Sequence, residues 1–465
     1  MVLIIRLLYI AFGFFLSINQ GVSIIVGNLR TGQILGSDIF MPVDIPVYLL
    51  LLLTADRSKQ TNYWFFAFVM KLLMIVFYLL AITGEFIAYD YAEFRFQFVH
   101  LSRAILIFYT ISSRLHDKMF LKSFLYGLLA GLGFQSFIGF WQWQIGSIYL
   151  PYLKTSSGYR VTGTMGVPNA FGAYLITLIP LVIRMAFFTD LKPKILWIII
   201  SIWSVGALYA TYTRGAWLAF VGAMLLFSLN DFNTKKIKRH QKVIFAVVGL
   251  VFIVFMGIKY GDNIVGRMKG STEAISSNEK HSRISLAKDA MRIINENKAF
   301  GVGLNNYRHF ADQTTLGLRM VHNAYLLIGA EQGLIGLSIF IFVHIIIFIY
   351  GLKLLKSRDK LIYNVGSATL TGYLALLVYH LVAPDYRMVG VLMQHYRLLG
   401  MILALFLMDD LVAKKQLFLL RKKQLHKFKS LQNKKLPENK GEDTPESENT
   451  KQDKFHNISN IRKSH

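Results

Sequence analysis

Long apolar stretches recur along most of this sequence, and short polar turns separate them. A helix needs about 20 mainly apolar residues to cross the hydrocarbon core of a bilayer, and many of these stretches approach that length. Charged residues make up 17% of the chain and hydrophobic residues 54%, which does not suit a surface that faces water. We therefore predict an all-α integral membrane protein and exclude a soluble enzyme with a membrane anchor.

The apolar stretches predict about twelve transmembrane helices. Their expected positions are 7–27, 39–54, 63–83, 96–112, 119–140, 170–189, 194–210, 215–229, 242–259, 323–350, 365–383 and 390–408. Residues 1–259 would hold helices 1–9, and residues 323–410 would hold helices 10–12. The first stretch lacks a small-residue cleavage site, so we expect a retained helix rather than a signal peptide. The segment 260–322 has no apolar run long enough to span, and we expect one large loop there.

The basic residues predict the orientation of these helices, because Lys and Arg are retained on the cytoplasmic side. With the N-terminus inside, every expected cytoplasmic turn is basic, whereas the outer turn 84–95 carries three acids and one arginine. Both ends of the chain are then cytoplasmic, and the loop 260–322 is extracytoplasmic. This arrangement explains much of the net charge of +25 without nucleic acid as a partner.

The tail 411–465 is expected to be cytoplasmic. Residues 414–435 hold nine Lys or Arg and no acid, so this strip either lies on anionic lipid headgroups or is a plain stop-transfer tail. Residues 436–465 are polar, and we expect them to be disordered. The chain has no cysteine, which excludes disulfides, thiolate metal sites and cysteine nucleophiles.

Arg214 is the first candidate site residue. Thr213 and Arg214 open the expected helix at 215–229 from the outer side, with Thr213 as its N-cap. A helix N-terminus carries partial positive charge, so a cation there is unfavourable unless an anion joins it. Arg214 therefore indicates one half of an anion site. An arginine that reaches a lipid headgroup phosphate is the alternative.

Arg283 is the second candidate, in the first turn of a helix that Ser282 is expected to cap inside the long loop. One face of this helix is apolar and consists of Ala287, Ala290, Met291 and Ile294. Arg283 lies along that face, so we expect it at a binding cleft, with a salt bridge to an unknown acid as the alternative. Gly301 and Gly303 follow in a turn where glycine allows backbone angles that other residues avoid.

His322 is the third candidate, at the point where the long loop re-enters the membrane before Asn323 and Tyr325, which we expect to bind substrate. A histidine can take or give a proton near neutral pH, although a lone histidine at an interface is more often structural. Two first-turn arginines and a histidine on one membrane face suit a pyrophosphate clamp beside a general base.

Further polar residues near outer helix ends are expected to bind substrate or to pair with one another. The first group comprises Arg160, which could extend the anion surface, Asn169 in the turn that enters the next helix, and His100 with Arg103 one turn apart. The second group, around the last outer turn, comprises His380, Asp385, Arg387, His395 and Arg397.

Several catalytic motifs are missing from the sequence. It contains no Asp-x-Asp pair, no His-Glu-x-x-His, no Gly-x-Ser-x-Gly and no P-loop. Metal-bound nucleotide-sugar chemistry, zinc hydrolysis and nucleotide hydrolysis therefore lack support. We expect no metal and no cofactor, so that the energy of the reaction comes with the substrate.

Four stretches, in this order, resemble the O-antigen ligase and O-antigen polymerase family of bacterial membrane glycosyltransferases. They are GTMGVPNAFGAYL from Gly163, TRGAWLAF from Thr213, SRISLAKDAMRIINENKAFGVGLNNY from Ser282 and VHNAYLLIGAEQGLIG from Val321. The resemblance covers about 160–340, and its specificity lies in order, spacing and topology. The chain departs from the family at Leu286, where an aromatic residue is expected, and at Ala299, where proline is expected.

The resemblance implies a metal-independent transfer of a glycan at the outer face of the bacterial cytoplasmic (inner) membrane. The donor would be a glycan on polyprenyl (undecaprenyl) pyrophosphate, and the acceptor a lipid-A core, a protein or another carrier-linked glycan. Arg214 and Arg283 would hold the pyrophosphate, and His322 would activate the acceptor hydroxyl. Attack at the anomeric carbon would invert it.

Two other classes of function compete with this prediction. A flippase or transporter would place polar groups near the midplane of the membrane, often on paired broken helices, whereas this chain places them near outer helix ends. A scaffold for polysaccharide export would not require two arginines and a histidine at one point. Within the enzyme class, ligase and polymerase stay unresolved, because they share the donor and differ in the acceptor.

Overall fold

The computed structural model describes residues 1–18, 22–27, 34–56, 60–145, 160–233, 283–311 and 320–435. The chain divides into two units, Met1–Ala413 and Lys414–His465. The first unit holds nearly all of the described helices, and the site is built within it. In the second unit the described residues are the last part of helix α14.

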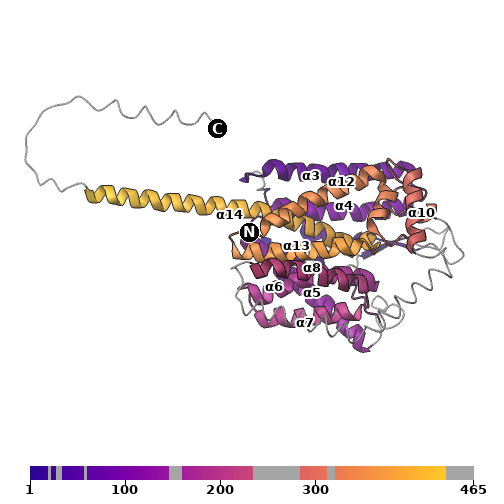
Figure 1. Cartoon of the computed structure of the whole chain (residues 1–465), viewed down its shortest axis with the longest axis horizontal. Coiled ribbons are helices and arrows are strands. Elements are labelled where there is room, and N and C mark those ends of the chain that lie inside the picture. The colour runs from indigo at the N-terminus through magenta and orange to yellow at the C-terminus, as the bar shows by residue number, and fades with distance from the viewer. Residues whose placement is uncertain are drawn as a thin grey trace, which may run out of the picture. The chain divides into compact units, whose positions relative to one another are not determined.

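The first unit is built mainly from helices (Figure 1). In chain order they are α1 (Val2–Phe15), α2 (Asp44–Leu53), α3 (Trp64–Ile87), α4 (Tyr91–Arg114), α5 (Lys118–Ile145), α6 (Pro168–Phe188), α7 (Lys194–Ala210), α8 (Arg214–Asn233), α10 (Arg283–Glu296), α11 (Tyr307–Phe310), α12 (Ala324–Leu354), α13 (Lys360–His380), the 3-10 helix η3 (Asp385–Arg387) and α14 (Val389–Lys435). Strands β1 (Val22–Gly27) and β2 (Ile34–Phe40) pair in antiparallel fashion.

Six of the described helices are long and apolar enough to cross a membrane, namely α3, α5, α6, α12, α13 and α14. The apolar helices α1, α2, α7 and the Arg214–Leu226 part of α8 are shorter. Most observed helices begin within a few residues of the predicted positions, which supports a membrane protein. The expected span at 242–259 lies outside the described residues, and the number twelve and the N-in, C-in topology stay predictions.

The prediction was wrong at the first span. A helix was expected over 7–27, but α1 ends at Phe15 and residues 22–27 form β1. The sequence offers a reason, because polar residues interrupt the apolar run after Leu16 and β-branched residues dominate from Val22 to Val26. The predicted all-α class is supported for the rest of the described chain, to which this segment adds one two-stranded sheet.

Helices α6 and α13 form the buried centre that positions the site. They pack so closely that a Cβ atom on Gly372 of α13 would lie 2.5 Å from the backbone oxygen of Thr177 in α6. Small residues at such contacts let two helix backbones approach, which is how helices commonly associate in membranes. The pair brings Asn169, near the start of α6, beside Tyr379, near the end of α13: the Tyr379 hydroxyl lies 3.3 Å from the Asn169 carbonyl.

The helix ends gather in two groups at opposite ends of the bundle. At one end, the Asp90 N–H donates to Asn306 Oδ1 over 2.7 Å, and α10 lies at this end in Figure 1. At the other end, Lys118 pairs with Asp359. Asp90 belongs to the turn 84–95, which was predicted to be extracytoplasmic, whereas Lys118 and Asp359 belong to turns that were predicted to be cytoplasmic.

A break in α12 at Gly333 receives the segment that follows α10. Gly333 has φ 68° and ψ −178°, and the Leu334 N–H donates to the Lys298 carbonyl over 2.7 Å. Gly301 and Gly303 also have positive φ, as their turn predicted, and the N–H of Gly303 donates to the carbonyl of Glu331 over 2.9 Å. The Ala299 to Leu304 turn is thus fixed against the broken helix.

A buried ion pair secures the same junction. Glu331 of α12 pairs with Arg387 of η3, and their side chains are 5% and 9% exposed. Arg387 also donates to Asn305 Oδ1 over 2.9 Å, and the Tyr307 N–H donates to Glu331 Oε1 over 3.4 Å. Arg387, a candidate from the sequence, therefore ties α12, η3 and the loop together.

We expect Gly333→Ala to destabilise the protein. Its backbone angles are accessible almost only to glycine, at a cost of about 1–3 kcal/mol for other residues, and a Cβ atom would collide with the Ala299 carbonyl. Thermal unfolding of the purified variant should show a clearly lowered midpoint. Gly206→Ala in α7 is the matched control, because a Cβ there meets nothing within 4 Å and alanine favours helix. Equal midpoints for the two variants would contradict this account of the break.

Candidate functional site

Arg160 joins three segments at the end of the bundle that carries α10. Its Nε donates to the Thr211 carbonyl over 2.9 Å, and its Nη2 donates to Asn169 Oδ1 over 2.9 Å. The same Nη2 lies 3.3 Å from Thr213 Oγ1 in the turn between α7 and α8. The structure thus brings two predicted binding residues, Arg160 and Asn169, into direct contact beside the start of α8.

Tyr379, in the last turn of α13, lies beside these residues. Its hydroxyl donates to Asp385 Oδ2 over 2.6 Å. The guanidinium groups of Arg160 and Arg283 both lie close enough to interact electrostatically with this hydroxyl. Arg283 belongs to α10, far along the chain from Arg160, so cations from two distant segments lie within electrostatic range of one phenol. We call the group formed by Arg160, Asn169, Arg214, Arg283 and Tyr379 the arginine corner.

Arg214 is placed in the corner by its neighbour. A Cβ atom on Gly215 would lie 3.0 Å from Val382 Cγ2 and 3.4 Å from Tyr379 Cε2, so the start of α8 packs against the end of α13. Helix α8 begins at Arg214, as predicted, and the Arg214 side chain is half-buried. The Thr213 hydroxyl donates to the Pro168 carbonyl over 3.2 Å, which ties the start of α8 to the start of α6.

His322 lies in the same region, because its neighbour Asn323 contacts the end of α13. The side chain of Asn323 caps α12 by accepting from the Leu326 N–H over 3.0 Å, and its Nδ2 donates to the Leu381 carbonyl over 3.1 Å. Leu381 lies two residues beyond Tyr379. The hydroxyl of Tyr325 donates to the Leu377 carbonyl over 3.0 Å, so these two predicted binding residues hold the start of α12 against the end of α13. His322 is exposed beside this junction.

Arg103 and His100 make different contacts. Arg103 forms a two-pronged ion pair with Asp44 of α2, with Nε to Oδ1 at 2.8 Å and Nη2 to Oδ2 at 3.1 Å. His100 Nδ1 lies 2.8 Å from Arg103 Nη1, and all three side chains are buried. The ion pair of Arg103 with Asp44 packs α2 on α4, and the predicted binding role of Arg103 and His100 stays a prediction.

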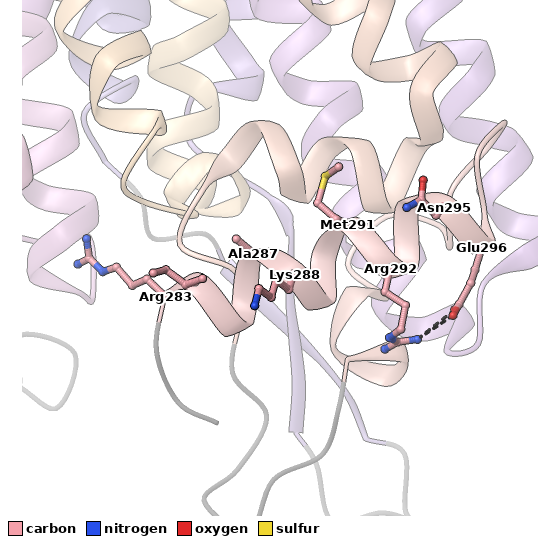
Figure 2. Close-up of a pocket in the computed structure, with 8 residues that line it drawn as sticks. Arg283, Ala287, Lys288, Met291, Arg292, Asn295 and Glu296 are labelled. Atoms are coloured by element: carbon pink, nitrogen blue, oxygen red, sulfur yellow. Dashed lines mark hydrogen bonds and ion pairs between the residues drawn. The ribbon is translucent and has the colours of Figure 1, made fainter. Parts of the chain in front are cut away.

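A shallow groove of about 730 Å³ runs along the outer face of α10 (Figure 2). Arg283 lines one end of the groove and Glu296 the other, and Figure 2 shows the Arg283 side chain extending away from the remaining labelled residues. Met291 lines the groove and is 48% exposed, whereas Ala290 and Ile294 are buried. The predicted apolar face is therefore divided, because Ala290 and Ile294 pack inward and Ala287 with Met291 form the floor of the groove.

Tyr379 was not among the residues singled out from the sequence, and Asp385 was only a secondary candidate. Asp385 is buried, and this burial raises the pKa of its carboxyl, while the hydrogen bond from Tyr379 opposes the rise. The one sequence signal for Tyr379 is its place beside His380 at the polar end of an apolar stretch. Its role depends on contacts between segments that lie far apart in the chain.

One group among the described residues could hold a metal ion, namely Asp90, Glu93 and His309. Glu93 already pairs with Arg308 and accepts a contact from His309 Nε2 at 3.2 Å. Burial and the charge of Arg308 lower the pKa of His309, against the opposite effect of Asp90. These pairs fix α11 to the start of α4 at the same end of the bundle.

Residues 199–341 match a family model described as O-antigen ligase. That match supports the O-antigen ligase family for this chain. It covers less than half of the sequence and includes Arg214, Arg283 and His322, whereas the stretch from Gly163 lies before it. No curated protein matches the chain. Together, this match and the six candidate spans support an O-antigen ligase or polymerase type of function and a multi-pass membrane location.

Proposed function

We propose that this chain transfers a glycan from polyprenyl pyrophosphate to an acceptor hydroxyl at the extracytoplasmic face of the bacterial cytoplasmic membrane. The observation that carries the proposal is that Arg160 and Arg283 both lie within electrostatic range of Tyr379, and that the start of α8, where Arg214 stands, packs against the same end of α13. Cations from three separate segments lie in this region, and charged hydrogen bonds from several cations are what hold a pyrophosphate group.

The proposed mechanism uses few groups. Arg214 and Arg283 bind the pyrophosphate oxygens, and Arg160 adds positive charge while it positions Asn169. His322 takes the proton of the acceptor hydroxyl as the acceptor oxygen forms its bond to the anomeric carbon. The bond from that carbon to the phosphate oxygen breaks, and polyprenyl pyrophosphate leaves with the electron pair. One displacement inverts the anomeric carbon, and the phosphate ester supplies the energy.

The position of the corner favours this reaction over transport. A transporter of an anionic lipid-linked glycan would need its cations along a path near the membrane midplane. Here two of the arginines lie at helix ends, because Arg214 begins α8 and Arg283 begins α10. Tyr379 also lies near a helix end, one residue before the end of α13. A scaffold without activity would tolerate the loss of His322.

The glycan profile of a deletion strain tests the function and separates ligase from polymerase. A polymerase that is lost leaves short chains, because repeat units are no longer joined. A ligase that is lost leaves long chains on the lipid carrier, because they no longer reach their acceptor. An unchanged profile of carrier-linked and surface glycans would contradict both forms of the proposal.

We expect the end of the bundle that carries α10 to face away from the cytoplasm. The chain has no cysteine, so a single introduced cysteine is the one thiol that the reagent can label, and its labelling shows on which side of the membrane it lies. Lys288→Cys on α10 and Lys356→Cys after α12 are both at exposed positions. An impermeant thiol reagent on intact spheroplasts or cells without an outer barrier should label position 288 and leave position 356 unlabelled until the membrane is opened. The reverse pattern would overturn the topology and the proposed location of the site.

A further inference from the structure

A second cavity lies at the other end of the bundle, away from the arginine corner. Its volume is about 340 Å³, and α5, the turn from α6 to α7 and the start of α13 line it. Opposite ends of α6 and α13 contribute to the two places: Asn169 and Tyr379 lie at the corner, whereas Thr189 and Lys360 line this cavity. The transfer reaction proposed above uses no residue of the cavity.

Three lysines surround the cavity. Lys118 and Lys122 lie one turn apart on the same face of α5, and Lys360 begins α13. Two like charges at this spacing disfavour a helix, so an anion between them would be stabilising. No ion pair joins Lys122 to another side chain in the described part of the chain.

Two aspartates in the cavity leave part of this charge uncompensated. Asp359 caps α13 by accepting from the N–H groups of Leu361 and Ile362, and it also pairs with Lys118. Asp190 is 84% exposed, and its pair with Lys360 at 3.2 Å is weak because water screens both groups. Lys122 and Lys360 therefore keep positive charge that can meet a ligand.

We propose that this cavity binds the phosphate group of an anionic phospholipid headgroup. Basic pockets between membrane helices on the cytoplasmic side bind such headgroups, and lipid phosphates lie at the depth of helix ends. Helices α5, α6 and α13, whose ends form the cavity, are all long and apolar enough to span. The bilayer therefore brings its phosphates to the level of the three lysines, and the Lys122 ammonium is placed to bind one.

Calorimetric titration of the purified full-length protein in non-ionic detergent tests the site. The probes are dihexanoyl phosphatidylglycerol and inorganic phosphate, each added to the wild type, Lys122→Gln, Lys360→Gln and Lys356→Gln. Loss of one near-surface charge should weaken binding of the lipid about fivefold for Lys122→Gln and for Lys360→Gln. Lys356→Gln, exposed and outside the cavity, should bind like the wild type.

Inorganic phosphate should bind much more weakly than the lipid, because it gains nothing from the apolar helix surface. If it binds as tightly, the lipid assignment is overturned in favour of a free phosphate ligand. If the wild type and both cavity variants bind the lipid equally, the site itself is wrong. Unfolding midpoints without lipid confirm folding, and the second lysine variant decides the question if the first does not fold.

Discussion

His322→Gln should lower glycan transfer at least about a hundredfold while the protein still folds and binds its donor. A positioned general base contributes about 10² to 10⁴ in rate, and glutamine keeps the size and hydrogen bonding of histidine but cannot take a proton. The hydrogen bond from Asn323 to the Leu381 carbonyl holds the backbone junction at this position and is kept in the variant, so insertion and folding should survive. The measurement is transfer by purified enzyme, with donor binding measured on the same preparation.

His309→Gln is the matched control for this variant. His309 lies at the same end of the bundle, but its Nε2 is held 3.2 Å from Glu93, and it belongs to the packing of α11. Its loss should leave transfer within a few-fold of the wild type. If His322→Gln kept most of the activity, His322 would be an orienting residue, and the base would have to be sought among the residues that contact the corner, beginning with Asp385.

Arg283→Lys and Arg214→Lys should each weaken donor binding about tenfold or more. Lysine keeps the charge but loses the planar fork that grips two phosphate oxygens at once, and such charged hydrogen bonds contribute about 1.5–3 kcal/mol. Arg283 and Arg160 both lie within electrostatic range of the Tyr379 hydroxyl, so we expect a ligand of pyrophosphate size beside it to interact with both cations. The measurement is equilibrium binding of a polyprenyl pyrophosphate to the purified variants.

Arg292→Lys provides the control on the same helix. Arg292 pairs with Asp289 at 2.6 Å and with Glu296 at 3.0 Å on α10, and it donates to the Phe310 carbonyl over 2.9 Å, so its fork is already engaged by protein groups. Donor affinity should not change in this variant. Unchanged affinity in the Arg283 and Arg214 variants as well would assign those two residues to lipid headgroups instead.

Hydropathy predicted most helices, because helix geometry fixes how many apolar residues are needed to cross a bilayer of a given thickness. The start of α8 at Arg214 was also predicted, since the polar Thr213 marks helix entry, and α6 begins at Pro168, close to the predicted 170. The strand at 22–27 was not predicted, because an apolar run counts toward a span whatever the local β-propensity of its residues.

Contacts between distant segments could not be predicted. The break at Gly333 within the expected helix 323–350 exists because the Lys298 carbonyl binds the Leu334 N–H, 36 residues further along the chain. Arg103 was predicted to bind substrate because it lies near an outer helix end. Its ion pair with Asp44 could not be predicted, because that pair depends on how α2 packs on α4. Tyr379 was likewise not predicted, because its hydroxyl interacts with Asp385 and with two arginines from other segments of the chain.

The central claim is that this protein forms a glycosidic bond at the expense of a pyrophosphate ester. It is tested most directly by reconstituting the purified protein in vesicles with a radiolabelled glycan on polyprenyl pyrophosphate and an acceptor glycan, without nucleotide or added metal. We predict that label moves to the acceptor and that free polyprenyl pyrophosphate appears in equal amount, both dependent on His322. Movement of the intact donor across the membrane without cleavage would contradict the account and identify a transporter instead.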